Sequence, residues 1–446
     1  MIKKVLVANR GEIAVRIIRA CREMGIETVA VYSQADEEAL HTQLADEAIC
    51  IGPAPSSESY LNMEQIISAT LVSGADAIHP GFGFLSENSK FVELCEKCNI
   101  TFIGPSSEVI QKMGNKAQAR RTMIEAGVPV IPGSKEAVRD VSHGAEIAEE
   151  IGYPVMIKAA LGGGGKGMRV AETRETFAAS FQTAQKEAQM AFGDGTMYLE
   201  RFVRNPRHIE FQILADCYGN AIHLGERDCS IQRNNQKMIE ESPSAVIDEE
   251  LRSRMGQAAV QAAKAAGYTN AGTIEFLLER DGQFYFMEMN TRIQVEHPVT
   301  EWVTGIDLIQ EQIRIASGLP LSYRQEDIKL SGHAIECRIN AENPDKNFRP
   351  SPGTITDLYL PGGKGVRIDT AIYSGYTVPA YYDSMLAKLI VHADTREQAI
   401  SKMRTALGEV IIEGIDTNID YQYEIMNHPD YQSGKIDIEF ISKWQR

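Results

Sequence analysis

The sequence predicts a mixed α/β and α+β fold, and three observations carry that prediction. Residues 1–104 alternate short apolar runs with helical periods, which is typical of a parallel sheet with crossover helices. Residues 271–299 hold two apolar runs around Arg280-Asp281-Gly282, a pattern that predicts a β-hairpin. Between them, four consecutive glycines at 162–165 separate two predicted strands. A length of 446 residues fits about three domains.

The composition excludes several classes of protein. A hydrophobic content of 43% and a charged content of 24% are ordinary for a globular chain. The net charge of −16 argues against a general nucleic-acid partner, because phosphate binding needs a basic surface. No 18-residue uncharged stretch is present, so no membrane span is expected. The seven cysteines form no disulfide framework, which favours a reduced, cytoplasmic setting.

The N-terminal elements follow in order. Strands are expected at 4–8, 28–32, 48–51 and 101–103, and helices at 12–24 and 60–72. The first turn lacks the pattern GxGxxG, so a dinucleotide site there is not expected. The loop 79–88, which carries Glu87, is either a substrate-side loop or a tight turn. Residues 105–130 are expected to be a helical connector, with Lys116 near a helix start.

Residues 131–203 are expected to form a compact unit around the glycine-rich stretch. Strands at 154–160 and 196–202 and a helix at about 174–190 surround the sequence LGGGGKGMRV (161–170). Consecutive glycines can wrap backbone N–H groups around phosphates, although no Ser or Thr follows Lys166 as in a Walker A loop. We expect a flexible flap over a nucleotide; a plain hairpin tip is the alternative. Lys158 is placed to meet phosphate oxygens, and residues 200–203 to bind a purine edge.

The rest of the chain carries strands, polar stretches and two further predicted helices. Strands are expected at 208–215 and 221–225, and the polar residues 226–243 are expected to be a basic loop, or simply a solvated one. A single helix is expected at about 300–317 and a final helix at about 396–408. A strand at 333–340 would place Glu336, Arg338 and Asn340 on one face.

The predicted hairpin at 271–299 points to a metal site. If Asp281-Gly282 is a two-residue turn, Glu275 lies opposite Glu288, and Asn290 shares their face. Opposed carboxylates repel, so a cation should stand between them. Mg²⁺ takes one or two carboxylates and completes its shell with water and substrate phosphates. The alternative is a solvated hairpin with chance acids. If the chain stays extended, the same face continues through 292, 294 and 296.

Six motifs resemble those of biotin carboxylases, the ATP-grasp enzymes found as a subunit of bacterial acetyl-CoA carboxylase. They are VANRGEIAVRIIRAC, HPGFGFLSEN, KAALGGGGKGMR, ERDCSIQR, MEMNTRIQVEHPVTE and GHAIECRINAE, and the resemblance is expected to cover about residues 4–390. The resemblance implies an ATP-grasp fold with an N-terminal Rossmann-like domain (1–104), a helical connector (105–130), a mobile lid with a glycine flap (131–203), a catalytic core (204–330) and a C-terminal mixed α+β domain (331–446).

The resemblance also implies the reaction. Such enzymes make carboxyphosphate from ATP and bicarbonate with Mg²⁺ or Mn²⁺, and then carboxylate biotin held on biotin carboxyl carrier protein. Carboxyltransferase subunits pass the carboxyl group on, which feeds malonyl-CoA and fatty acid synthesis. We expect a free-standing subunit, because no Met-Lys-Met biotin segment follows.

The site residues that the resemblance implies fall into four sets. Those implied for ATP are Lys116, Lys158, Gly164, Gly165, Glu200, Arg201, Val203, His208, Gln232, Leu277, Glu275 and Glu288. The metal ligands would be Glu275, Glu288 and Asn290, and the bicarbonate-binding residues Lys237, Arg292, Gln294 and Val295. The catalytic residues would be Lys237, Arg292, Glu296 as the general base and Arg338 as the donor to the biotin oxyanion.

The chain departs from the family pattern at two places, and two alternatives to this function stay open. Asn235 stands where many relatives have a histidine, and Leu161 with four glycines where many have five glycines. A homodimer is implied through Arg19, Glu23 and the 362–367 loop, where Lys364 replaces an aromatic of some relatives. Another ATP-grasp carboxylate–amine ligase would not need a bicarbonate pocket. A regulator without catalysis should have lost an acidic or basic site residue, and all are present.

Overall fold

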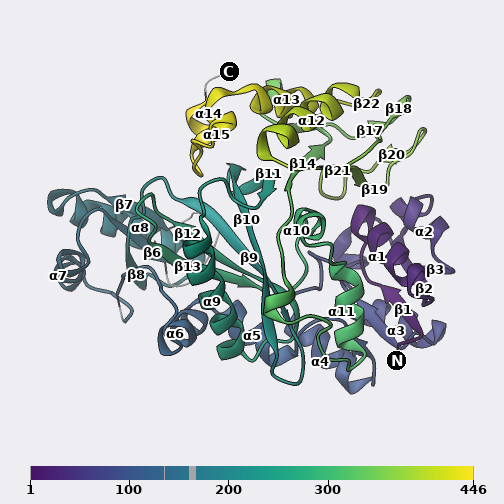
Figure 1. Ribbon diagram of the computed structural model, residues 1–446. Helices are drawn as coiled ribbons and strands as arrows, with labels where there is room; N and C mark the ends of the chain where they lie inside the picture. Colours follow the sequence, from purple (N-terminus) through teal and green to yellow (C-terminus); the bar gives the residue numbers. More distant parts are fainter. Residues whose placement is uncertain (1, 135, 160–166, 445–446) are drawn as a thin grey trace. The chain divides into compact units, whose positions relative to one another are not determined.

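The computed structural model describes residues 2–134, 136–159 and 167–444, and the chain divides into two compact units (Figure 1). The first unit comprises residues 1–128, 207–276 and 288–446, and the second comprises 129–206 and 277–287. Among the described residues, no helix combines the length and apolar character that crossing a bilayer requires.

The N-terminal part of the first unit is the predicted parallel sheet. Its strands are β1 (Lys4–Val7), β2 (Glu27–Ser33), β3 (Glu47–Gly52), β4 (Ala77–His79) and β5 (Thr101–Phe102), in the order β3-β2-β1-β4-β5 with every pair parallel. Strand β4 was not predicted. The accompanying helices are α1 (Gly11–Glu23), α2 (Leu40–Leu44), α3 (Met63–Ser73) and α4 (Ser89–Lys97).

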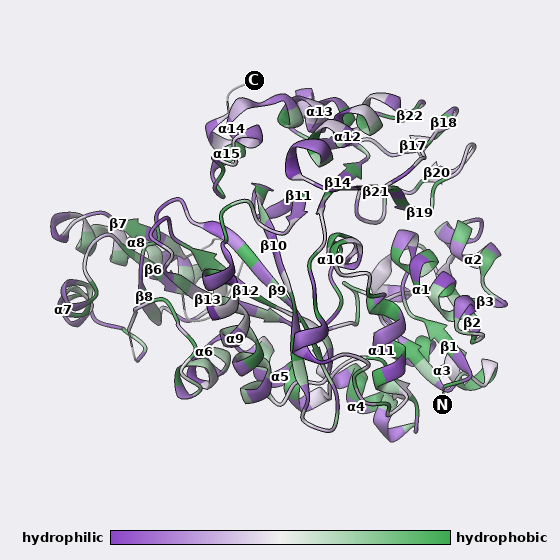
Figure 2. Ribbon diagram, viewed as in Figure 1, coloured by the Kyte–Doolittle hydropathy of each residue, from purple (hydrophilic) through white to green (hydrophobic). Residues whose placement is uncertain are grey.

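Side-chain alternation along β1 explains why helices cover both faces of this sheet. Val5 and Val7 join a buried cluster with α1, whereas Leu6 joins another with α3 and α4. In Figure 2 the strand β1 is correspondingly green. Residues 105–130, where a helical connector was expected, contain α5 (Ser107–Gly114) and α6 (Lys116–Glu125). The Asn115 side chain accepts a hydrogen bond from the Gln118 N–H, so α6 begins at Lys116.

An eight-stranded sheet forms the centre of the first unit, in the order β13-β12-β9-β10-β11-β14-β21-β19. Its strands are β9 (Arg207–Ala215), β10 (Ala221–Arg233), β11 (Gln236–Ser242), β12 (Asn270–Leu278), β13 (Phe284–Asn290), β14 (His333–Asn340), β19 (Val366–Thr370) and β21 (Met385–Ala393). The hairpin tip formed by the ends of β12 and β13 belongs to the second unit.

The prediction of a basic loop at 226–243 is wrong, because these residues form most of β10 and all of β11. Their polar side chains hid the strand pattern, yet most of them are buried and paired with one another. The two strands are joined at Asn234 and Asn235, which both have positive φ (51° and 63°). Asparagine tolerates this backbone region and favours the tight turns of hairpins.

The prediction of a single helix at about 300–317 is also wrong. The segment forms two helices, α10 (His297–Thr304) and α11 (Leu308–Ala316). Gly305, with φ 72°, ends α10, and the Asp307 side chain caps α11 by accepting from the Gln310 N–H. Helix α9 (Glu249–Ala266) was not predicted.

The C-terminal helix expected at about 396–408 is present as α12 (Arg396–Glu409), but it is not the final one. It is followed by α13 (Ile419–Asn427), α14 (Pro429–Gln432) and α15 (Phe440–Lys443). Tyr421, Phe440 and Trp444 cluster there with buried residues of β14 and β21. Short strands complete this part: β15 (Glu342–Asn343), β16 (Arg349–Pro350), β17 (Gly353–Thr354), β18 (Leu358–Tyr359), β20 (Thr377–Val378) and β22 (Ile411–Ile412).

The second unit is a small antiparallel sheet covered by two helices. The strands β6 (Val155–Ala159), β7 (Met168–Ala171) and β8 (Met197–Arg201) lie in the order β7-β6-β8, with α7 (Val141–Ile151) and α8 (Arg174–Phe192) packed against them. Lys158 pairs with Met168 across β6 and β7, so two strands do flank the glycine stretch as expected. The flap residues Leu161, Gly164, Gly165 and Lys166 lie outside the described residues.

The tip of the β12–β13 hairpin differs from the expected two-residue turn. The Glu279 N–H donates to the Gln283 carbonyl (2.8 Å), and the Gly282 N–H donates to the Glu279 carbonyl (3.1 Å). Three residues therefore form the loop, and Gly282 adopts the left-handed backbone (φ 82°) that closes such turns. The pairing deduced from a two-residue turn does not follow, and side-chain contacts must establish which residues share a face.

Candidate active site

Lys237 of β11 lies at the centre of a ring of three carboxylates in the first unit. Its ammonium donates to Glu210 (2.5 Å), Glu275 (2.9 Å) and Glu296 (2.7 Å), which come from β9, β12 and the residue before α10. Burial lowers the pKa of Lys237, but the three acids outweigh that effect and raise it well above its ordinary value. The ammonium is therefore a fixed positive charge.

Glu275 gathers several of the predicted site residues around it. One of its oxygens accepts from Lys237, from the Asn290 amide (2.8 Å) and from the Gln294 amide (2.9 Å). The other lies 3.2 Å from His208 Nε2. Burial raises the pKa of Glu275, but Lys237 and His208 hold it below its ordinary value. These contacts confirm that Glu275, Asn290 and Gln294 face one another. Gln232 lies beside them, with its amide nitrogen 2.9 Å from the other His208 ring nitrogen.

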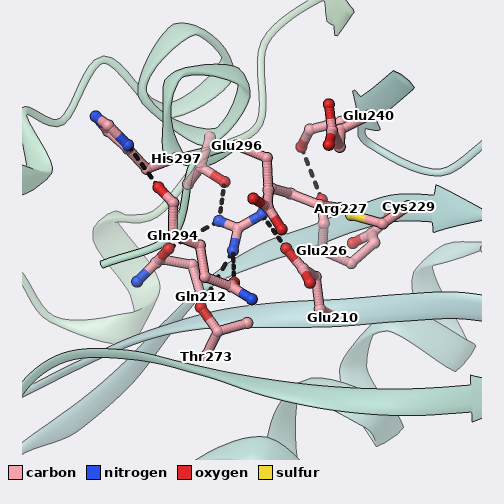
Figure 3. A network of polar contacts seen from close by, with 12 residues as sticks. Glu210, Gln212, Glu226, Arg227, Cys229, Glu240, Thr273, Gln294, Glu296 and His297 are labelled. Atoms are coloured by element: carbon pink, nitrogen blue, oxygen red, sulfur yellow. Dashed lines mark hydrogen bonds and ion pairs between the residues drawn. The ribbon is translucent and has the colours of Figure 1, made fainter. Parts of the chain in front are cut away.

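A fully buried arginine, Arg227 of β10, supports this ring from within the sheet (Figure 3). Its guanidinium donates to the side chains of Glu210 (2.5 Å), Gln212 (2.7 Å), Gln294 (2.7 Å), Thr300 (3.0 Å) and Thr273 (3.1 Å). Sequence reasoning noted Arg227 only as part of a loop. The signal that could have placed it is the period of two in His208, Glu210 and Gln212, which puts three polar side chains on one face of a predicted strand.

Glu296 is held between two cations. One oxygen accepts from Lys237 (2.7 Å) and the other from Arg338 of β14 (2.9 Å). The residue is 1% exposed. Burial raises the pKa of Glu296, but Lys237 and Arg338 outweigh it and lower the pKa, so the carboxylate is ionised at neutral pH. Arg338 also donates to Glu240 (2.7 Å), a buried acid of β11 that sequence reasoning missed.

Arg292 is positioned by the loop that precedes α4. Its Nε donates to Glu87 (2.9 Å) and an Nη to the Asn290 side-chain oxygen (3.0 Å). Glu87 also accepts from the Thr291 N–H (3.1 Å), so it fixes both backbone and side chain at this point. The loop 79–88 is the strand-to-helix connection between β4 and α4, and a substrate-side role for it stays a prediction.

The predicted metal ligands fit a divalent cation. Glu288 has no hydrogen-bond or ion-pair partner within the described part of the chain, and burial together with the charge of Glu275 raises its pKa. A cation between these acids would relieve that repulsion, and carboxylate and amide oxygens suit Mg²⁺. Lys116, at the start of α6, acts in the opposite direction and lowers the pKa of Glu288.

Two other groups have ligand atoms within 4.8 Å of one another: His208 with Glu210 and Glu275, and Glu210 with Cys229 and Glu296. Lys237 already supplies the positive charge to the acids of both groups. Neither group therefore needs a metal.

The remaining predicted nucleotide residues lie in the second unit. Lys158 and Glu200 form an ion pair between β6 and β8. Arg201 donates to Glu279 (2.6 Å) and to the Tyr285 hydroxyl (2.7 Å). Val203 and Leu277 belong to one apolar cluster with Ile131 and Tyr285. The structure thus divides the predicted nucleotide residues into two sets, one in each unit.

Comparison with known proteins identifies the family. Three family models match consecutive parts of the chain: "Biotin carboxylase, N-terminal domain" (1–110), "Carbamoyl-phosphate synthase L chain, ATP binding domain" (115–324) and "Biotin carboxylase C-terminal domain" (336–443). Biotin carboxylase 1 of Bacillus subtilis is 59% identical over 445 residues, covering 100% of this chain and 99% of its own. The chain belongs to the biotin carboxylase family. Biotin carboxylase of Nostoc is 58% identical, with 99% of each chain covered.

Solved structures of biotin carboxylases give the same result. The biotin carboxylase of Campylobacter jejuni in a β,γ-ATP complex matches with a TM-score of 0.93 at 52% identity, covering 100% of this chain and 99% of that one. The biotin carboxylase domain dimer of Hydrogenobacter thermophilus 2-oxoglutarate carboxylase, with MgADP and bicarbonate, matches with a TM-score of 0.91 at 52% identity, covering 99% and 98%. The predicted ATP-grasp fold and enzyme class are confirmed.

Proposed function

We propose that this biotin carboxylase family member carboxylates biotin on a carrier protein, with ATP and bicarbonate as co-substrates and carboxyphosphate as the intermediate. The observation that carries the proposal is the placement of Glu296. It is a buried carboxylate with one oxygen on Lys237 and the other on Arg338, and Lys237 also donates to the proposed metal ligand Glu275. A base, an anion-binding lysine and an arginine for the second substrate thus meet at one point.

The residues proposed for the nucleotide are those that the resemblance to the family implies. They are His208, Gln232, Lys116, Lys158, Glu200, Arg201, Val203 and Leu277, together with Gly164 and Gly165. Glu275, Glu288 and Asn290 would hold Mg²⁺ or Mn²⁺, which supplies charge neutralisation at the transferring phosphoryl group. Phosphoryl transfer needs positioning and charge stabilisation more than covalent help, and the lysines contribute both.

The first chemical step consumes bicarbonate. Lys237, Arg292, Gln294 and the Val295 backbone bind the anion, and Glu296 removes its proton as its oxygen attacks the γ-phosphorus. The bond from that phosphorus to the bridging oxygen breaks, ADP leaves and carboxyphosphate remains. The low pKa of Glu296 keeps the base unprotonated until bicarbonate arrives.

The second step transfers the carboxyl group. Carboxyphosphate separates into CO₂ and phosphate, and the phosphate takes the proton from biotin N1′. The resulting oxyanion on the biotin ureido group is stabilised by Arg338, and N1′ then attacks CO₂. Burial lowers the pKa of Arg338, but Glu240 and Glu296 raise it by more. The charge of Arg338 is therefore permanent, which suits this role.

The wider setting is part of the proposal. We infer that the chain serves acetyl-CoA carboxylase in the cytoplasm, with biotin carboxyl carrier protein and carboxyltransferase subunits as partners. A 2-oxo acid carboxylase is the second candidate. A pyruvate carboxylase subunit of Methanothermobacter thermautotrophicus is 53% identical, covering 100% of this chain and 91% of its own. A homodimer through Arg19, Glu23 and the 362–367 loop with Lys364 is supported by the dimer named for the Hydrogenobacter domain.

Release of ADP from MgATP, followed with and without bicarbonate and free biotin, tests the proposal. Bicarbonate should be required, and biotin should accelerate the release. Glu296→Gln should lower turnover by about 10²–10⁴-fold while nucleotide still binds, since it removes only the proton acceptor. Glu38→Gln, at an exposed position, is the matched control. Release that needs an amine and a carboxylic acid in place of biotin would instead identify a carboxylate–amine ligase.

A further inference from the structure

Two buried side chains that have no role in the steps above hold the backbone just before α10. The Nδ1 atom of His297, the first residue of α10, lies 2.8 Å from the Gln294 carbonyl oxygen (Figure 3). The Nζ atom of Lys388 in β21 donates to the Val295 carbonyl oxygen at 2.9 Å. Both side chains are fully buried. Two successive carbonyl groups are therefore each fixed by a donor from the protein interior.

Fixing a carbonyl also fixes the amide on the other side of the same peptide plane. A trans peptide is planar, and its C=O and N–H bonds point in opposite directions. Among the described residues the cis peptides precede only Pro154 and Pro243, so the peptides that join residues 294 to 295 and 295 to 296 are trans. The Val295 N–H must point away from His297, and the Glu296 N–H away from Lys388. Neither N–H has a partner in the described part of the chain.

The donor roles of both side chains follow from chemistry. A carbonyl oxygen can only accept, so His297 Nδ1 carries the proton. Burial lowers the pKa of His297, and the charge of Lys388 lowers it further, so the ring is neutral. Lys388 keeps its charge because Glu12 of α1 lies 3.1 Å away and Asp369 of β19 lies 3.8 Å away. Burial lowers the pKa of Lys388, but these acids outweigh it.

We propose that His297 and Lys388 are positioning residues of the bicarbonate subsite. By holding two successive peptide planes, they aim the N–H groups of Val295 and Glu296 at the anion. Adjacent backbone N–H groups at the start of a helix bind anions through their partial positive charge. The inference rests on the proposed use of bicarbonate. It predicts that loss of either donor weakens bicarbonate binding and leaves nucleotide binding unchanged.

The test uses His297→Asn and His297→Leu in the full-length protein. An asparagine amide can replace the Nδ1 donor, whereas leucine has a similar size and no donor. Steady-state ADP release without biotin gives the KM values for bicarbonate and for ATP. Leucine should raise the bicarbonate KM at least tenfold with the ATP KM within twofold, and asparagine should stay within threefold of the original protein for both. The shift in Tm on adding bicarbonate should shrink only for the leucine variant.

A second variant covers the case in which His297→Leu does not fold. Lys388→Met combined with Glu12→Gln removes the second donor while leaving the buried charge balanced, and it should raise the bicarbonate KM in the same way. An unchanged bicarbonate KM in a folded variant overturns the inference, as does an equal rise in the leucine and asparagine variants. Failure of both leucine and methionine variants to fold would also overturn it, since the role would then be structural.

An Arg292→Ala variant separates this inference from the proposed function. It should raise the bicarbonate KM whether or not His297 and Lys388 act as described. If Arg292→Ala has that effect and His297→Leu does not, only the positioning role fails. If the unaltered protein shows no bicarbonate-dependent ADP release, the proposed function fails.

Discussion

Replacing Arg338 by methionine should separate the two chemical steps. In the structure Arg338 touches both the base, Glu296, at 2.9 Å and a second buried acid, Glu240, at 2.7 Å. Methionine fills a similar volume and removes the charge. The proposed oxyanion donor is lost outright, whereas the base loses only one of its two cations. Biotin carboxylation should therefore suffer much more than bicarbonate-dependent ADP release measured without biotin.

The sizes of the two effects can be compared from the contacts. Loss of one oxyanion donor typically costs about 10²–10³ in kcat, or about 3–4 kcal/mol. Two charges about 4 Å apart near a protein surface interact by about 4 kcal/mol, so losing Arg338 raises the pKa of Glu296. Lys237 still donates to Glu296 at 2.7 Å and keeps it ionised at neutral pH. We expect the biotin-free rate to fall less than about tenfold above neutral pH.

The assay is ADP release across pH 6–9, with and without free biotin. The Arg338→Met variant should lose the acceleration by biotin, and the acid limb of its biotin-free profile should move to higher pH. Loss of both rates to the same extent at pH 8 would refute the separate role of Arg338. An unmoved acid limb would refute the contact with Glu296 as a determinant of its pKa.

Three further predictions concern charged side chains of the site and of the network around it. Arg227→Met should lower the free energy of unfolding by about 3–5 kcal/mol in denaturant titrations, because Glu210 keeps only Lys237 as a cationic partner and the buried side chains of Gln212, Gln294, Thr273 and Thr300 lose their donor, whereas Arg324→Met at an exposed site should cost under about 1 kcal/mol. Burial raises the pKa of Glu240 from 4.5 to about 7, so the folded state holds a proton that the unfolded chain releases, and this group's contribution to stability falls as pH rises through that range. The Tm of Glu240→Gln relative to the original protein should thus increase from pH 5 to pH 8, by an amount equivalent to about 3 kcal/mol; a constant difference would contradict the shift. Glu288→Gln should raise the Mg²⁺ concentration needed for half-maximal ADP release at least tenfold while the metal-free Tm is unchanged, and an unaltered Mg²⁺ titration would contradict its role as a ligand.

The N-terminal sheet could be predicted because its signal is local. Apolar runs such as Lys4–Val7 and helices such as Gly11–Glu23 each show their own period within a few residues. The alternation of the two then fixes a parallel sheet, since parallel strands need crossover connections. The same reasoning placed β9 and β14 almost to the residue.

The predictions of secondary structure that were wrong concern segments whose structure depends on tertiary contacts. Strands β10 and β11 are polar because their side chains form a buried network, and a local period cannot distinguish such a strand from a solvated loop. At the hairpin tip, Arg280 adds a third loop residue before the left-handed Gly282, and the choice between two and three residues is a matter of backbone geometry. The break at Gly305 between α10 and α11 was present in the sequence as a helix-ending signal and was not used.

In the candidate site, too, some residues could be predicted from the sequence and others could not. The residues that could not be predicted affect the strength of the base. The acids of the hairpin could be found from a period of two, but the cations that keep them ionised come from other strands: Lys237 is 59 residues from Glu296, and Arg338 is 42 residues from it. Each oxygen of Glu296 accepts one hydrogen bond from these cations and keeps a second lone pair that can take a proton. Bicarbonate is itself an anion and competes for Lys237. Its arrival therefore draws positive charge away from Glu296, and we expect the pKa of the base to rise at the moment when a stronger base is needed.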